Sequence, residues 1–230
     1  MSENIKKITK AFVVDLDSRE NQNIILSTRP FNHQAHQVNE VTKKIYKLIK
    51  DAKHPNDDII LNHNEIKEAF FSPFKPQLKN AQVFLSHFHA DKNKVLKVKG
   101  YLESKTKHEV FVDSLFWDYK DDVLNKLAEY DDISGIEDAF TLILRESLEY
   151  MIKKCPYFVF LQSKNSVSLN QDLLGITYSA WIYEELKIAH SLIADNTLQA
   201  RIKAMRVSHN ITNLLRRFKL ISLDSLSNLL

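Results

Sequence analysis

The chain has 230 residues, of which 44% are hydrophobic and 27% are charged, and its formal net charge is +3. This length allows one or two domains with a buried core, and the composition is that of an ordinary globular protein. The small net charge argues against a nucleic-acid-binding protein, and no hydrophobic run approaches the roughly 18 residues that span a bilayer.

Two scarce residue types narrow the possible classes further. Cys155 is the single cysteine, so no internal disulfide can form, and the N-terminal sequence MSENIKKITK lacks the hydrophobic core of a signal peptide. We therefore expect a cytoplasmic protein without membrane attachment. Only three glycines occur, at Gly100, Gly135 and Gly175. This scarcity excludes a glycine-rich phosphate loop and the dinucleotide-binding G-x-G-x-x-G fingerprint.

Residues 1–80 are expected to form a small α/β or helical N-terminal extension that regulates the protein or docks a partner. The short hydrophobic runs Ala11–Leu16 and Asn23–Leu26 flank polar residues and predict a β-hairpin. Hydrophobic residues at helical spacing predict a helix over Val38–Ile49. Pro-containing residues 74–80 mark the predicted boundary before the main domain.

The predicted main domain, residues 81–230, alternates buried strands with helices. Strand, helix and strand in succession imply a parallel sheet. The tail, residues 196–230, is expected to be mainly helical, with a short strand near Lys203–Val207. The strands are expected at Gln82–Ser86, Glu109–Asp113 and Tyr157–Leu161, and the helices at Lys92–Ser104, Asp121–Glu129, Ile136–Lys154 and Ser179–Ala194.

The stretch after the first of these strands is the candidate site. In α/β proteins the carboxyl ends of parallel strands, and the loops that follow them, face the ligand-binding crevice. Asp91 lies where it can cap the N-terminus of the next helix. The polar and aromatic side chains that directly follow the hydrophobic run are, in order, Ser86, His87, Phe88, His89 and Asp91.

The spacing His87-x-His89-x-Asp91 is also typical of the first ligand cluster of metallo-β-lactamase-like hydrolases. Those proteins continue with His after the Asp, where this chain has Lys92, and they need further ligands downstream. The chain offers no convincing later ligand cluster. We therefore predict that no metal binds at these residues.

Three motifs occur in order along the chain: VFLSHFHAD at residues 83–91, EVFVDSLFWDY at residues 109–119, and SAWIYEEL at residues 179–186. Together they resemble the motifs of the Toll/interleukin-1 receptor (TIR) domain family, in its bacterial, NAD+-consuming branch. That family has a strand ending in Ser before a helix-starting Asp, and a strand ending in Asp before the variable BB loop. Its third motif is Ser-x-Trp-Cys-x-x-Glu-Leu. The resemblance covers about residues 81–195.

The resemblance implies a flavodoxin-like, three-layer fold and an NAD+ glycohydrolase or cyclase, with NAD+ as substrate and no cofactor. Glu185 matches the catalytic glutamate of the family motif. Cleavage of the nicotinamide–ribose bond builds oxocarbenium character at the ribose, which a nearby carboxylate stabilises. Nicotinamide leaves without protonation, so one carboxylate suffices. Without the motif, Glu185 reads as a solvated acidic residue near a helix N-terminus.

Other residues of the three motifs are expected to bind the substrate. Phe88 and Trp117 are available to stack on its aromatic rings, although Phe88 is equally compatible with a core position. Trp181 is expected to pack and thereby to aim Glu185. The full set of expected substrate-binding residues is Ser86, His87, Phe88, Asp91, Asp113, Trp117, Ser179 and Trp181.

The chain departs from the family pattern at three places. Ile182 replaces the usual Cys of the third motif, which alters packing. The predicted BB loop lacks its usual Gly and has Asp118-Tyr-Lys instead, which bears on the conformation of that loop and on any assembly through it. The segment at residues 131–154 is longer than in a compact TIR domain.

The expected role is signalling in bacterial antiviral defence, by NAD+ depletion or by a cyclic ADP-ribose-like product. Expected partners are other copies, through TIR faces, and an effector or sensor protein, but neither nucleic acid nor membrane. Two alternatives stay open. One is a non-catalytic TIR scaffold that acts by protein–protein contact. The other is a nucleoside deoxyribosyltransferase-like enzyme, which shares the fold and uses a Glu nucleophile.

Overall fold

The computed structural model describes residues 10–29, 38–51, 62–72, 79–129, 134–169, 175–177, 179–193 and 209–230. Contacts within the chain divide it into two compact units. The first unit comprises residues 1–32, 81–114 and 148–230, and the second comprises residues 33–80 and 115–147. Among the described helices, none is both long enough and apolar enough to cross a membrane.

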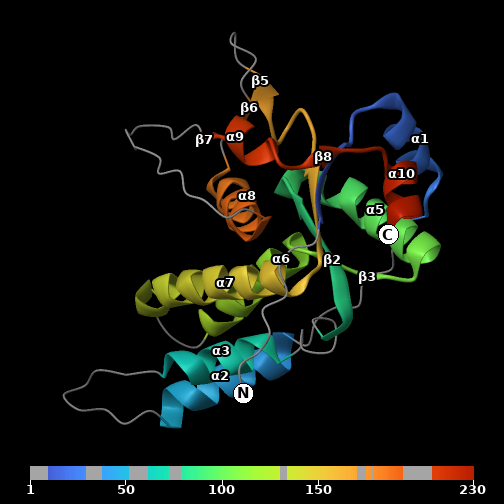
Figure 1. Ribbon diagram of the computed structural model, residues 1–230. Helices are drawn as coiled ribbons and strands as arrows, with labels where there is room; N and C mark the ends of the chain where they lie inside the picture. The colour runs from blue at the N-terminus through green and yellow to red at the C-terminus, as the bar shows by residue number, and fades with distance from the viewer. Residues whose placement is uncertain are drawn as a thin grey trace. The chain divides into compact units, whose positions relative to one another are not determined.

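The first unit is built on a five-stranded parallel sheet with the order β3-β2-β4-β1-β8 (Figure 1). Every neighbouring pair in it is parallel, and β2 pairs with both β3 and β4. The prediction that the three hydrophobic runs form adjacent parallel strands is therefore confirmed. The strands are β1 (Lys10–Asp15), β2 (Ala81–His87), β3 (Glu109–Val112), β4 (Tyr157–Gln162) and β8 (Lys219–Leu220).

Aromatic rings align across three neighbouring strands of the sheet, β3, β2 and β4. Phe84 of β2 lies opposite Phe111 of β3 and Phe158 of β4 in the strand register. Its ring stacks on both, with centroid distances of 5.8 Å to Phe111 and 5.5 Å to Phe158. Such same-face neighbours are the units that stabilise a sheet. The strands are hydrophobic without alternation because both faces of the sheet are covered.

Helices cover the two faces of this sheet. On one face α1 (Arg19–Ser27), α5 (Lys92–Thr106) and α10 (Leu223–Leu229) pack on one another, and α8 (Ala180–Ile193) packs on β1 and β2 from the other (Figure 1). The first unit is thus an α/β, flavodoxin-like three-layer fold. Smaller elements are η1 (His89–Asp91), β5 (Ser168–Leu169), β6 (Gly175–Thr177), β7 (His209–Asn210) and α9 (Thr212–Leu215); β5, β6 and β7 form an antiparallel sheet.

The N-terminal residues differ from their prediction. The expected hairpin is wrong: Ala11–Val14 lie in an internal strand between β4 and β8, and residues 23–26 lie in helix α1. Asn21 fixes that helix, because its amide donates to the carbonyl of Asp15 at 2.7 Å and its oxygen accepts from the Leu223 N–H at 2.9 Å. The compact units do change between residues 80 and 81, but residues 1–80 are not one region, because residues 1–32 belong to the first unit, where β1 lies inside the sheet.

The second unit contains α2 (Val38–Asp51) and α3 (His63–Phe71), together with most of α6 (Ser114–Leu127) and of α7 (Ser134–Lys154). Phe70 is at its core. The Phe70 ring lies 5.0 Å from that of Tyr119 and 5.4 Å from that of Phe140, and the Tyr119 hydroxyl donates to the Phe70 carbonyl. At the surface, Glu146 accepts from Lys67 at 2.7 Å.

Helix α6 replaces the aromatic loop expected after the second predicted strand. The helix already begins at Ser114, where the Asp113 carboxylate accepts a hydrogen bond from the Ser114 N–H at 2.8 Å. The expected BB loop at residues 114–120 is therefore wrong. The helices expected at residues 92–104 and 136–154 are confirmed as α5 and α7. The strand expected near residues 203–207 lies outside the described residues.

Replacement of Phe158 by Ala tests the aromatic core. Phe158 is fully buried and contacts the rings of Phe84 and Phe218. We expect Phe158→Ala to lower the free energy of unfolding by about 3–5 kcal/mol, measured by urea denaturation. Leu26→Ala is the control, because Leu26 is 75% exposed on α1 and its loss should change stability by about 0.5 kcal/mol or less. Equal effects of the two substitutions would contradict the strand assignment.

Deletion of the N-terminal residues tests the place of β1. A chain that starts at Lys79 lacks β1, so the backbone groups of β4 that pair with β1 are left open, and β8 loses its partner. An open hydrophobic edge promotes association of chains. We expect this truncated protein to aggregate, as measured by size-exclusion chromatography. A monodisperse, folded product would show that residues 1–78 are dispensable for the sheet.

Candidate functional site

Four polar side chains meet at the carboxyl edge of the sheet, and we call Ser86, His87, Asp113 and Glu185 the carboxyl cluster. Ser86 and His87 are the last two residues of β2, and Asp113 directly follows β3. Because β2 and β3 are parallel neighbours, their carboxyl ends lie at one edge. Glu185 comes from α8, which packs on β2. All four residues are buried, and the exposed fraction of Glu185 is 0%.

Short contacts join the members of the carboxyl cluster. The Ser86 hydroxyl Oγ donates to Glu185 Oε2 at 2.5 Å. The His87 ring nitrogen Nδ1 lies 2.6 Å from Asp113 Oδ1. Ser86 and Glu185 thus form one close pair, and His87 and Asp113 form another. The negative charge of Asp113 acts on the Glu185 carboxyl group and links the two pairs electrostatically.

The pKa of the Glu185 carboxyl group is raised well above its ordinary value. The largest cause is burial, which removes water from the charged form, and the next causes are the negative charge of Asp113 and the hydrogen bond to it. The hydrogen bond from Ser86 and the positive charge of His87 act in the opposite direction, with smaller effects. In this closed arrangement Glu185 therefore favours its protonated form.

Glu184 and Glu185 face different surroundings, as their 100° separation on a helix requires. The Glu184 side chain is 19% exposed and lies 3.8 Å from the Lys187 ammonium group. Glu185 points inward to Ser86. The third motif thus directs its second glutamate, the one that the family resemblance singles out, into the first unit.

Asp91 has a different role from the one expected. Asp91 occupies the N-cap position of α5, as expected, but its side chain makes no capping hydrogen bond there. The buried carboxylate instead accepts from the Ser163 hydroxyl at 2.5 Å and from the Asn165 amide at 3.0 Å. Asp91 therefore holds the segment after β4 against the segment after β2. Ser163 and Asn165 were not expected as site residues, although polar residues directly after a third parallel strand are the signal that points to them.

Asp17 makes a second link at the same edge of the sheet. It accepts from the backbone N–H of Lys164 at 2.8 Å and from the Lys94 ammonium group at 3.2 Å. The hydrogen bond from Lys164 is the main cause that lowers the pKa of Asp17. Together with Asp91, this residue ties the segments after β1, β2 and β4 to one another.

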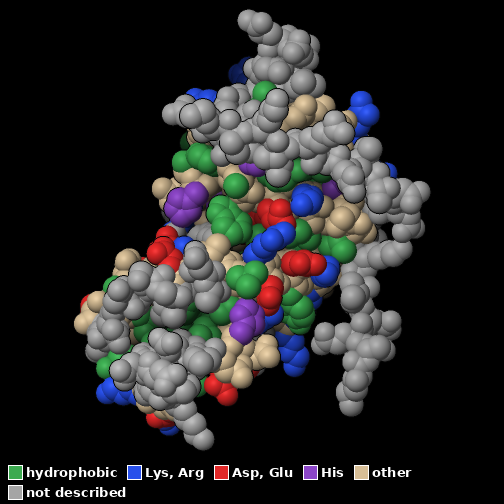
Figure 2. All heavy atoms as spheres, turned by 90° about the vertical axis from the view of Figure 1, so that its left-hand side faces the viewer, with side chains coloured by type: hydrophobic (Ala, Val, Ile, Leu, Met, Phe, Trp, Pro, Cys, Tyr) green, Lys and Arg blue, Asp and Glu red, His purple; other side chains and the backbone are tan. Residues whose placement is uncertain are grey.

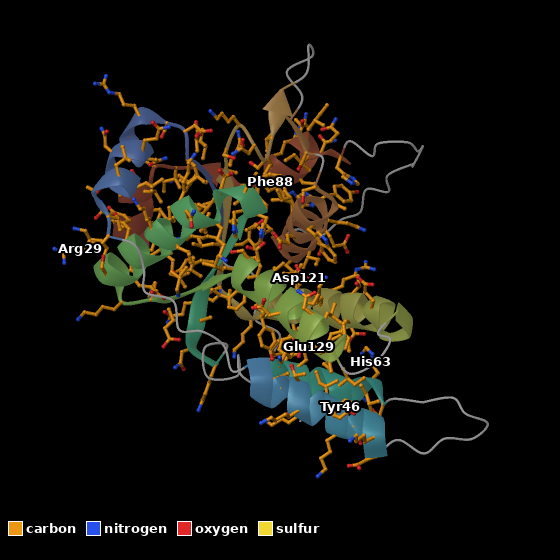
Figure 3. The ribbon with its side chains drawn as sticks, turned by 180° about the vertical axis from the view of Figure 1, so that it is seen from behind. Arg29, Tyr46, His63, Phe88, Asp121 and Glu129 are labelled. Carbon is orange, nitrogen blue, oxygen red and sulfur yellow. The ribbon has the colours of Figure 1, made fainter. Side chains whose placement is uncertain are left out.

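The remaining expected residues are placed as follows. Ser179 caps α8, because its hydroxyl accepts from the Ile182 N–H at 3.3 Å, as expected for a helix start. Phe88 is half-buried at the carboxyl end of β2 (Figure 3), and Trp181 is half-buried in the first turn of α8. Trp117 lies in α6, and its side chain is outside the described set. The expected grouping with Trp117 thus stays a prediction.

The two histidines of the candidate metal motif have different environments. His87 is buried in the carboxyl cluster, whereas His89 is exposed. Within the described ranges, no group of three or more His, Cys, Asp or Glu side chains is arranged to hold a metal ion. A separate groove of about 690 Å³ lies along α2 and α3 in the second unit, and none of the expected site residues lines it.

The surface charges on one face of the molecule are mixed. Figure 2 shows acidic and basic side chains interspersed with hydrophobic ones on that face. A nucleic-acid-binding face typically concentrates Lys and Arg in one patch or stripe. The described side chains on the face that Figure 2 draws do not show that concentration.

Comparison of the chain with protein-family models, with curated proteins and with solved structures found no match in any of the three. The function is therefore inferred from the geometry of the carboxyl cluster and from the chemistry of its side chains.

Replacement of Glu185 by Gln tests the raised pKa through protein stability. A carboxyl group whose pKa is raised on folding stabilises the folded state while it is protonated, and this contribution is lost as the pH rises toward the folded-state pKa. Gln cannot ionise. We expect Glu185→Gln to gain stability over the wild type as the pH rises above the ordinary value of 4.5, by about 1.4 kcal/mol per pH unit until the folded-state pKa is reached.

Thermal unfolding of both proteins between pH 4.5 and pH 8 measures this difference. Glu184→Gln is the matched control, because Glu184 is partly exposed, and its stability difference from the wild type should not change with pH by more than about 0.5 kcal/mol. A pH-independent difference for Glu185→Gln would mean that Glu185 titrates as an ordinary carboxyl group.

Proposed function

We propose that the chain is a TIR-like NAD+ nucleosidase that cleaves the nicotinamide–ribose bond, with Glu185 as the catalytic residue. The observation that carries the proposal is the position of Glu185: a buried carboxyl group, held by Ser86, at the carboxyl edge of a parallel sheet. This edge is where α/β folds of this kind bind their ligands. The three motifs that resemble the TIR family contribute Ser86, Asp113 and Glu185 to one cluster.

The chemistry of bond cleavage fits an ionised Glu185. As the bond to nicotinamide breaks, positive charge develops on the ribose, and a fixed carboxylate stabilises it more strongly in the transition state than in the ground state. The hydrogen bond from Ser86 holds the carboxyl group in one orientation. Nicotinamide leaves as a neutral molecule and needs no general acid. Water completes hydrolysis, and an internal nucleophile of the ADP-ribose completes cyclisation.

The closed cluster must open for this reaction, since Glu185 is fully buried and its protonated form is favoured. The nicotinamide ring of NAD+ carries a positive charge. A cation beside a carboxyl group lowers the pKa of that group. NAD+ binding therefore favours the ionised form of Glu185 in a way that a neutral nucleoside does not. Phe88, half-buried after β2, offers a ring for stacking.

A second candidate rests on the presence of two buried carboxyl groups, those of Asp113 and Glu185, in the carboxyl cluster. Cleavage of an N-glycosidic bond to a purine or pyrimidine base uses one carboxylate at the sugar and an acid at the leaving base. Asp113 and Glu185 are both buried in the carboxyl cluster, where the charge of Asp113 acts on Glu185, and they could provide such a pair. A nucleoside deoxyribosyltransferase-like activity is therefore the alternative substrate class. It differs from the first candidate in requiring no positive charge on the leaving group.

Purified protein incubated with NAD+, and separately with deoxynucleosides, tests both candidates by chromatography of the products. We expect nicotinamide release from NAD+, and we expect Glu185→Gln to slow it by about 10²–10³-fold, because the variant keeps the shape but loses the charge. Glu184→Gln should retain wild-type activity, since Glu184 does not join the carboxyl cluster.

Three outcomes are informative beyond the expected one. Base release from deoxynucleosides without NAD+ cleavage would favour the second candidate. Loss of activity in Glu184→Gln but not in Glu185→Gln would contradict the assignment of the catalytic glutamate. If no substrate turns over, even at high protein concentration where copies assemble, the non-catalytic scaffold replaces the enzyme.

A further inference from the structure

The groove along α2 and α3 in the second unit is a surface for assembly. We propose that it is the contact surface of a symmetric dimer, with a second copy of the chain as its occupant. The groove lies outside residues 81–195, over which the TIR resemblance extends, so it differs from the TIR faces expected to mediate assembly. The proposal goes beyond the proposed enzymatic activity and does not depend on it.

Two neighbouring helices form the groove. Helices α2 and α3 contact each other and lie side by side (Figure 1). The lining side chains recur three or four residues apart on each helix, so each helix contributes one face. The groove has a volume of about 690 Å³. The lining residues on which the argument depends are Lys44, Lys47 and Leu48 of α2, and Glu65, Glu68 and Ala69 of α3.

Hydrophobic side chains take part in the lining. Leu48 and Ala69 are half-buried there, whereas Ile45 and Phe70 of the same two helices are fully buried. Each helix therefore buries one face in its own unit and leaves part of a second hydrophobic face in contact with water. Removal of such side chains from water favours association with another chain.

The two sides of the groove carry opposite charges. Lys44 and Lys47 are exposed on α2, and Glu65 and Glu68 are exposed on α3. Asp51, the last residue of α2, is the exception to this division. The groove is thus basic along most of one side and acidic along the other.

Some of these charges are available to a second chain. Among the described residues, neither Lys47 nor Glu65 has an ion-pair partner. By contrast, Lys67, which is also on α3 but does not line the groove, lies 2.7 Å from Glu146. Lysine and glutamate on opposite sides of the groove therefore offer two unused charges of opposite sign.

Two-fold symmetry matches this distribution of charge. In an isologous dimer, a contact between one residue of the first copy and another residue of the second occurs twice. If α2 of one copy faces α3 of the other, Lys lies opposite Glu in both contacts. If α2 faces α2, Lys lies opposite Lys, which is repulsive. A partner that carried only one sign of charge would be repelled by one side of the groove, so a second copy is the better occupant.

Reversal of one lysine and one glutamate tests the dimer with the full chain. Sedimentation velocity over a range of protein concentrations measures self-association. We expect Lys47→Glu and Glu65→Lys each to weaken the wild-type dimer by about tenfold or more, since each places like charges opposite each other in both contacts. Lys105→Glu is the control and should dimerise like the wild type. Lys105 is exposed on α5 in the first unit, and its replacement changes the net charge equally.

An equimolar mixture of the two variants gives the sharper result. The Lys47→Glu variant has Glu at both positions, and the Glu65→Lys variant has Lys at both. The mixture should therefore form a dimer about as well as the wild type, although neither variant does so alone. The double variant, Lys47→Glu with Glu65→Lys, should also dimerise. A mixture that stays monomeric while both variants are folded, as judged by circular dichroism, would overturn the proposal.

The wild type alone provides a second test, which does not depend on the folding of any variant. Salt screens exposed charges, so the dimer should weaken as the ionic strength rises. A wild type that is monomeric at every soluble concentration, or a dimer that salt does not weaken, would overturn the proposal. A monomeric wild type whose groove binds a different protein would do so as well. Nicotinamide release is measured separately, so failure of the proposed function leaves the result for the dimer unchanged.

Discussion

The burial of strand β2 on both of its faces is the constraint on which the rest of the first unit depends. Its hydrophobic residues leave no face for water, so β2 requires a hydrogen-bonded strand at each edge and a helix layer on each side. Pairing with β3 and β4 meets the first requirement, and α5 and α8 contribute to the second. The same pairing brings the carboxyl ends of these strands to one edge. The position of the polar cluster follows from the packing of the hydrophobic strand before it.

A buried cluster of Ser, His, Asp and Glu lowers the stability of a fold whose centre is otherwise hydrophobic. Each polar group gives up its water, and the hydrogen bonds within the cluster only partly offset this loss. A hydrophobic replacement at Glu185 would pack in the same space without that cost. Groups of this kind gather where chemistry requires an unusual ionisation state, and structural ion-pair networks produce the same pattern.

Much of the sheet could be predicted from local sequence patterns, and the errors share one physical cause. The hydrophobic runs of β2, β3 and β4 and the periodicity of α5 and α7 are local signals, and they were sufficient. The partner of β1 is not local: Lys10 pairs with Tyr157, so the run at residues 11–16 was assigned to a neighbouring segment instead. The aromatic residues after Asp113 suggested a loop, whereas they lie in helix α6, in which Tyr119 packs against Phe70.

The sequence predicted which residues belong to the candidate site, but it predicted fewer of the contacts between them. Ser86, Asp113 and Glu185 stood out through their motifs, but periodicity cannot show that Asp113 contacts His87 and that Ser86 contacts Glu185. For Asp91, the position at the start of a helix was predicted, but the hydrogen-bond partners were not. Its position before a helix suggested a cap, yet Ser163 and Asn165, distant in sequence, compete successfully for its carboxylate. Local rules fail where a polar side chain finds better partners in the tertiary structure.

The place of β1 between β4 and β8 has a consequence for the order of events during synthesis. β1 is made before both of its partners, β4 and β8, which come much later in the chain. Contacts between such distant segments form slowly, because the long intervening loop must close first. The pairs of β1 therefore cannot form until β4 and β8 have been made. Until then the hydrophobic residues of β1 lack the strands that bury them, and unpaired strand edges of this kind promote association with other chains.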